Sequence, residues 1–214
     1  MILRSRQIAR GIELSLRDHR PFLRLAGCFC AVLASTLWAG LEDNDNLIWV
    51  ANGVLLAYLL VVPRWRWLRY LVTAFLALLV GGVVVSPHRW QQSLVLSVLN
   101  LLEVGIAAVL LRNRSAQLPQ FTNRRYLLRF LRNAAFIAPL IAGAVFALLF
   151  ALWIKGDVVA AFRRWTVTDA LGNTIATPAC VVLLQMRLRR HGAGRSLWLF
   201  EIAVVLVTIA AFCQ

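Results

Sequence analysis

Residues 134–154 read AAFIAPLIAGAVFALLFALWI, a run without a single charged side chain. An α-helix rises about 1.5 Å per residue, so this run would be about 30 Å long as a helix. That length matches the hydrocarbon core of a bilayer, which is about 30 Å thick. The stretch therefore predicts a transmembrane helix.

The whole chain has the composition that such a helix requires. Its 214 residues are 61% hydrophobic and 15% charged, whereas soluble domains are about 45–50% apolar and about 25% charged. The formal net charge of +14 raises the question of nucleic-acid binding. The arginines, however, stand between long apolar runs and form no continuous basic face. We therefore expect the lipid bilayer as a partner and no nucleic acid.

Residues 134–154 are the fifth of seven runs that approach the length of a membrane span. The runs are 22–41, 47–62, 68–86, 94–111, 134–154, 166–186 and 197–213. The second run is short and the sixth is polar, so these two are the least regular. The predicted fold class is an all-α integral membrane bundle of about seven transmembrane helices. It forms a single domain, 1–214, with a cytoplasmic tail at 1–21, and an eighth helix is expected to be missing or to lie beyond the chain end.

Basic residues crowd into alternate connections between these runs. The connection after the first run is acidic, Glu42-Asp43-Asn44-Asp45-Asn46, and the next one is basic, with Arg64, Arg66 and Arg69. Lys and Arg accumulate in the cytoplasmic loops of membrane proteins. The alternation predicts a multi-pass protein with a cytoplasmic amino terminus and with Gln214 on the outer face.

The segment from Arg124 to Arg132 carries apolar side chains at helical spacing and arginines on the opposite side, after a candidate cap at Thr122 or Asn123. This pattern predicts an amphipathic interfacial helix that lies on the cytoplasmic membrane surface and then turns into the fifth span. An unstructured basic loop is the alternative.

A few polar side chains lie inside the predicted spans at matching depths. Such groups are costly in hydrocarbon, so each needs a structural or functional reason. The candidate ligand-binding residues are Asn52, Asn100, Glu103, Asp169, Asn173 and Thr177. Residues three or four apart share a helix face, so the pair on the fourth span and the triplet on the sixth can each face one neighbouring helix. They form an outward-facing polar chamber, or else hydrogen bonds that hold the bundle together; spacing alone favours neither.

Two further features of the spans have ordinary explanations. Pro178 predicts a kink in the sixth span, with a moving hinge as the alternative. Trp165 and other tryptophans near the helix ends are expected to be interfacial anchors that need no ligand to explain them.

No catalytic or metal-binding set is evident in the sequence. His19, His88 and His191 fall in predicted loops, and Cys28 with Cys30 lack the spacing of a zinc site. The sequence also contains no glycine-rich phosphate-binding loop. We expect no enzymatic activity, no cofactor and no metal in this chain.

Several short motifs, taken in order, resemble the first family of bacterial membrane-associated sensor domains, the MASE type. They are Trp49-Val50-Ala51-Asn52-Gly53, Asn100-Leu101-Leu102-Glu103, Leu110-Leu111-Arg112, the segment from Phe121 to Pro139, and Trp165-Thr166-Val167-Thr168-Asp169-Ala170-Leu171-Gly172 followed by Thr177-Pro178. Val50 departs from the family, whose members often carry proline after the tryptophan. The resemblance covers about residues 20–190.

The resemblance implies a domain of the bacterial inner membrane with about eight helices. It also implies a cytoplasmic output domain, such as a diguanylate cyclase, a cyclic-di-GMP phosphodiesterase or a histidine kinase. The leading hypothesis is a sensory input module that binds an unknown small ligand or a membrane-protein partner. The sequence does not decide whether it forms a homodimer. The alternative is a small proton- or cation-coupled transporter in which Glu103 and Asp169 relay a cation.

Overall fold

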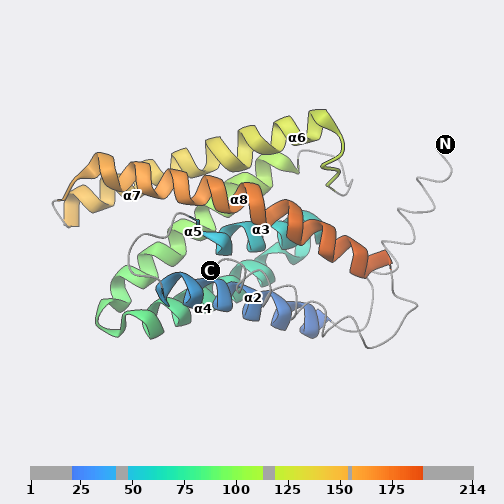
Figure 1. The fold of residues 1–214 in the computed structure, drawn as a ribbon. Helices are drawn as coiled ribbons and strands as arrows, with labels where there is room; N and C mark the ends of the chain where they lie inside the picture. The colour runs from blue at the N-terminus through green and yellow to red at the C-terminus, as the bar shows by residue number, and fades with distance from the viewer. Residues whose placement is uncertain (1–20, 42–47, 113–118, 154–155, 190–214) are drawn as a thin grey trace.

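Helices make up all regular structure in the part of the chain that is described. A computed structural model describes residues 21–41, 48–112, 119–153 and 156–189. The helices are α2 (Pro21–Leu41), α3 (Val50–Val61), α4 (Trp67–Val85), α5 (Trp90–Leu111), α6 (Arg124–Phe130), α7 (Ala138–Trp153) and α8 (Val158–Arg189). Two short 3-10 turns are η1 (Arg64–Arg66) and η2 (Pro87–Arg89), and the π-helical segment η3 (Leu131–Ile137) joins α6 to α7. The long helices run side by side (Figure 1).

Within the described ranges, five helical runs are long and apolar enough to cross a membrane. They are Phe22–Gly40, Arg64–Val85, Pro87–Leu111, Arg124–Leu152 and Val158–Met186. These runs confirm an all-α membrane fold but not a count of seven. The second predicted span is the 12-residue helix α3, which is about 18 Å long and too short to cross about 30 Å of hydrocarbon. The run at 197–213 and residues 1–20 of the predicted tail lie outside the described residues.

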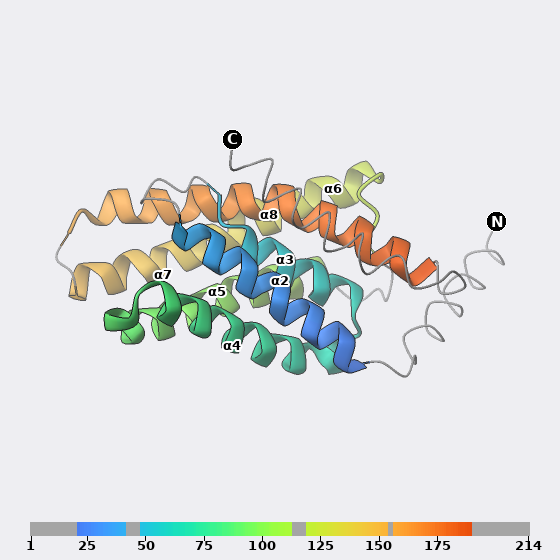
Figure 2. The same cartoon turned by 60° about the horizontal axis from the view of Figure 1, so that its bottom comes forward.

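Helix α3 lies at the centre of the bundle. It is placed between α8 on one side and α2 and α4 on the other (Figures 1 and 2). Every residue from Ala51 to Ala57 is buried. A helix that is apolar and covered on all sides is a core helix, so α3 needs no lipid-facing surface.

The outer helices turn apolar side chains away from this core. On α4 the exposed large apolar side chains recur every four residues, at Leu68, Val72, Leu76, Val80 and Val84. A continuous stripe of this kind is unfavourable in water. It is the surface expected of a helix that faces lipid.

The basic segment after α5 is helical, but it does not turn into the next span as the sequence predicted. Asn123 caps α6, because its Oδ1 accepts hydrogen bonds from the backbone N–H groups of Arg125 (3.0 Å) and Tyr126 (3.4 Å). Segments α6, η3 and α7 then follow one another without a break. The turn is absent because η3 continues the helix with wider, π-type bonding instead of ending it.

Helix α8 begins earlier than the apolar pattern predicted. Asp157 caps it, since its Oδ1 accepts from the backbone N–H groups of Val159 and Ala160, both at 3.0 Å. The connection expected around Arg163 and Arg164 is therefore the first part of α8. No proline or glycine interrupts the turns that follow the cap, so the helix continues through this polar stretch.

The end of α3 that lies away from Trp49 is held by cationic and aromatic side chains. Trp67 Nε1 and Arg112 Nη1 each donate to the Leu59 carbonyl oxygen at 2.9 Å, and Arg112 also donates to the Val62 carbonyl oxygen. The last carbonyls of a helix lack intrahelical donors and carry partial negative charge, so a guanidinium there is stabilising. Both ends of this short helix are thus fixed inside the protein.

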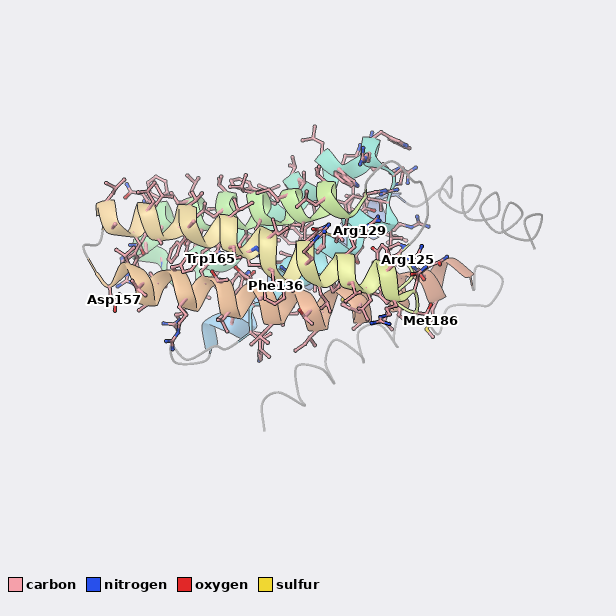
Figure 3. All side chains as sticks on the ribbon, turned by 90° about the horizontal axis from the view of Figure 1, so that it is seen from above. Arg125, Arg129, Phe136, Asp157, Trp165 and Met186 are labelled. Atoms are coloured by element: carbon pink, nitrogen blue, oxygen red, sulfur yellow. The ribbon has the colours of Figure 1, made fainter. Side chains whose placement is uncertain are left out.

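Several arginines lie together at one end of the bundle. Figure 3 shows Arg125 and Arg129 at the same end as Met186 and away from Asp157. Arg64 and Arg112 are joined by a hydrogen bond from the Arg64 side chain to the Arg112 carbonyl. We call this the basic end, and α3 points its carboxyl terminus toward it.

Candidate functional site

Helix α3 begins inside the bundle, directly against α8. The backbone N–H of Trp49 donates to the Thr168 carbonyl oxygen at 3.1 Å. Two glycines permit this close approach: a Cβ on Gly172 would lie 1.9 Å from the Trp49 carbonyl oxygen, and one on Gly53 would lie 2.7 Å from the Gly172 carbonyl oxygen. The partially positive amino end of α3 is therefore held in the protein interior, at the depth of residues 168–172.

The η3 segment leaves one backbone carbonyl without a helical partner. The N–H of Ala138 bonds the carbonyl of Asn133, five residues back, and so does not serve Ala134. The next N–H along the chain would belong to Pro139, which has none. The Ala134 carbonyl accepts instead from Asn173 Nδ2 at 3.1 Å. The proline and the wide turn together provide an acceptor for a side chain of α8.

Glu103 on α5 is the centre of the side-chain cluster. Its Oε1 accepts from Asn173 Nδ2 at 2.9 Å and its Oε2 accepts from Trp165 Nε1 at 3.1 Å. The carboxyl group of Asp169 lies next to it, because Asp169 is between Trp165 and Asn173 on the same face of α8, and Asn52 approaches the same group from α3. The Asn52 amide is not oriented well enough to make a hydrogen bond of good geometry with any described residue. Side chains of α3 and α8 thus converge on one carboxyl group of α5.

Thr177 and Asn100 lie at the edges of this cluster. Thr177 Oγ1 donates to the Gly53 carbonyl oxygen at 3.1 Å and so joins α8 to α3. Asn100 Nδ2 donates to the Leu96 carbonyl oxygen of its own helix at 2.9 Å. The first is a bond between helices, whereas the second stays within α5, and the Asn100 oxygen has no partner among the described residues.

The structure brings the predicted residues together. All six candidates are between 0% and 5% exposed, and Glu103, Asp169, Asn173 and Asn52 are in mutual contact range through Glu103. A buried carboxyl group needs polar partners, and here the carboxyl groups of Glu103 and Asp169 lie next to each other. An opening of the cluster toward the outer face stays a prediction, because the described conformation covers these side chains.

The interpretation of Trp165 as an interfacial anchor is wrong. The indole N–H donates to Glu103 inside the bundle, and the ring packs against Phe146 at a centroid distance of 4.6 Å. Because α8 begins earlier than predicted, Trp165 lies within the helix and not at its end. The sequence does contain a signal for this role, because Trp165 lies four residues before Asp169 and therefore on the same helix face.

Several buried polar atoms on α3, α5 and α8, and one on Trp49, have no hydrogen-bond partner among the described residues. They are Trp49 Nε1, Asn52 Oδ1 and Nδ2, Asn100 Oδ1, Thr166 Oγ1, Asp169 Oδ1 and Asn173 Oδ1. Buried polar groups are normally satisfied, and each one left over costs roughly 1–3 kcal/mol. These atoms are donors and acceptors that the described residues leave available.

The chemistry that this cluster supports is binding and proton exchange. It offers two carboxyl groups, amide groups and an indole N–H, but no nucleophile with an adjacent base. Within the described ranges, no group of three or more His, Cys, Asp or Glu side chains is placed to hold a metal ion. The arrangement therefore fits recognition of a small species.

Comparison with known proteins gives one match. The family model MASE1 matches residues 21–213, a stretch that contains all six candidate residues. No curated protein and no solved structure matches the chain.

Proposed function

This chain belongs to the MASE1 family, the membrane-integral sensory domains of signalling proteins, and we propose that the cluster around Glu103 is its sensory site. A small ligand or a membrane partner would bind there through Asp169, Asn173, Thr177, Asn100, Glu103 and Asn52. The observation that carries this proposal is the set of buried polar atoms without protein partners on α3, α5 and α8.

Binding at this cluster would change how α8 packs against α3 and α5. A ligand can shift such an equilibrium by no more than the difference in its affinity for the two packings. The change can reach the basic end along α3, whose far end is fixed by Arg112, and along the part of α8 beyond Pro178. Thr177 ties these two helices together next to that proline.

The basic end is proposed to face the cytoplasm, where an output domain would receive the signal. That domain would be a diguanylate cyclase, a cyclic-di-GMP phosphodiesterase or a histidine kinase. The opposite end, with Asp157, would then face the periplasm of a bacterial inner membrane. A periplasmic ligand would reach Glu103 only when the bundle opens, because the cluster is buried as described.

The test is to remove each charge while retaining shape, with Asp169→Asn and Glu103→Gln in the full-length protein. We expect normal amounts in the membrane together with lost or locked output. Asp157→Asn is the matched control: it removes an exposed carboxylate, and asparagine caps a helix as well as aspartate does. Wild-type output in both cluster variants would mean that the cluster is structural and the proposal is wrong.

A carrier in which Glu103 and Asp169 relay a cation is the second candidate, and the buried acid pair is the observation that favours it. Flux measurements on the purified chain in liposomes separate the two functions. A sensor should show no proton or cation flux above that of empty liposomes, whereas a carrier should show flux that Asp169→Asn abolishes.

A further inference from the structure

The direct contact between two carboxyl groups requires a proton. Glu103 and Asp169 come from different helices, and their carboxyl groups lie side by side in the interior, because Trp165 and Asn173, one turn before and one turn after Asp169 on α8, both donate to Glu103. An ionised carboxylate can only accept hydrogen bonds, so two carboxylates cannot bond each other. One member of the pair must therefore be a carboxylic acid whose O–H donates to its neighbour.

The hydrogen bonds indicate which member carries that proton. Both oxygens of Glu103 accept N–H groups, from Asn173 at 2.9 Å and from Trp165 at 3.1 Å, as an ionised carboxylate does. Asp169 Oδ1 has no partner among the described residues, and the side chain is buried. An unpartnered carbonyl oxygen of a neutral acid is far less costly than an unpartnered carboxylate oxygen. Asp169 is therefore the acid and Glu103 the carboxylate.

No other charge compensates this pair within the described residues. From α3 the facing group is the neutral Asn52, and α7 carries no ionisable side chain toward it. Arg132 on η3 is exposed and donates to Asn133 Oδ1 at 3.1 Å, and Arg163 and Arg164 on α8 are exposed. The pair can thus hold one negative charge, but a second negative charge on it would have no counter-ion.

We propose that Glu103 and Asp169 are a binding site for a single proton, carried by Asp169, and that this proton holds α8 against α5. When the O–H bond of Asp169 breaks, the proton passes to water and leaves two carboxylates in contact. Their repulsion in a low-dielectric interior favours a packing in which the two helices separate. The inference rests on the proposed function only for its signalling consequence, in which the proton is the ligand or a co-ligand of the sensor.

The two charge-removing variants should behave differently under this proposal. In Asp169→Asn the new amide N–H can donate to Glu103 as the acid does, so the variant mimics the protonated state at every pH. In Glu103→Gln one of the two N–H donors, Trp165 or Asn173, faces an amide NH₂ and loses its acceptor. We expect the first variant to keep its packing and lose its pH dependence, and the second to reach the membrane in normal amounts but to unfold at a lower temperature.

Infrared difference spectroscopy on the full chain in lipid nanodiscs tests the proton directly. Between acidic and alkaline pH, we expect one carbonyl band of a buried carboxylic acid to disappear, and to shift in D₂O. The band should be absent in Asp169→Asn and present in Asp157→Asn. Because a variant can fail to fold, the second measurement uses the wild type: carboxyl-¹³C aspartate should shift the band, and labelled glutamate should not.

The proton site is wrong if no such band titrates over the pH range in which the chain stays folded, or if the band survives in Asp169→Asn. These outcomes do not depend on signalling. Altered output in Asp169→Asn without a titrating band would overturn the proton site and leave the sensory site in place. A titrating band with wild-type output in both cluster variants would support the proton site and overturn the sensory proposal.

Discussion

The amide of Asn173 uses both of its N–H groups to fix the site. One donates to Glu103 on α5 and the other to the Ala134 carbonyl on η3. A single side chain of α8 therefore joins two neighbouring segments, and both of its partners are buried acceptors. This explains why an asparagine, with two donors on one nitrogen, stands at this position.

Replacing Asn173 with Ala should therefore destabilise the protein more than the loss of a few side-chain atoms suggests. Glu103 would lose one donor and the Ala134 carbonyl its partner in the same step, at roughly 1–3 kcal/mol for each group. Thermal unfolding in detergent measures the effect. Thr174→Ala is the control on the next residue, since Thr174 Oγ1 bonds only the Ala170 carbonyl of its own helix. Equal midpoints for the two variants would contradict this account.

Among the elements, α3 and α8 form the closest pair, and glycine permits it. Replacing Gly53 with Ala would place a Cβ 2.7 Å from the Gly172 carbonyl oxygen and 2.8 Å from Ala176 Cβ. Overpacking of this kind costs about 1–3 kcal/mol, so we expect a lower unfolding temperature. Gly105→Ala on α5 is the control, because a Cβ there would meet nothing within 4 Å. A stability loss as large for Gly105→Ala would show that close packing is not the cause.

A second test at the level of elements concerns the π-helical segment. Pro139→Ala restores an N–H that can bond the Ala134 carbonyl, which then competes with Asn173. We expect the coupling between positions 139 and 173 in a double-mutant cycle with Asn173→Ala to be on the order of 0.5–3 kcal/mol. Pro87→Ala, in the exposed turn η2, is the control and should be additive with Asn173→Ala. If the effects of Pro139→Ala and Asn173→Ala on stability simply add, the Ala134 carbonyl does not depend on Asn173 for its hydrogen bond.

Apolar length predicted most of the helices, because spanning the bilayer requires a run that is visible in sequence. The run 47–62 was already short for a span, but it did not show that the helix begins only at Val50, because Trp49 is extended. The bonding of η3 depends on Asn173, a partner far along the chain, so no local pattern shows it. Matched depth selected six candidate residues, and all six are buried. It missed Trp165, because a tryptophan near an expected helix end is already explained as an anchor at the membrane interface.

At the scale of the whole molecule, the bundle has a basic end and an opposite end marked by Asp157 (Figure 3). The proposed orientation predicts different access for a membrane-impermeant maleimide in a cysteine-free background. Asp157→Cys should react in cells whose inner membrane is intact. Gln120→Cys, at the basic end, should react only after permeabilisation. The reverse pattern would show that the orientation is opposite to the one proposed. The cysteine-free chain measures the background labelling.

The π-helical segment also sets a register between the two halves of one long helix. A residue in an α-helix advances by about 100° around the axis, at 3.6 residues per turn. If residues 131–137 took ordinary α-helical winding with no change in their number, the surplus residue would rotate α6 by about that angle relative to α7. Phe130, which is buried against Phe121 at a centroid distance of 5.0 Å, would swing out of its contact, and the arginines of α6 would face a different direction. The direction in which the basic end presents its charges is thus set by the winding of this seven-residue segment.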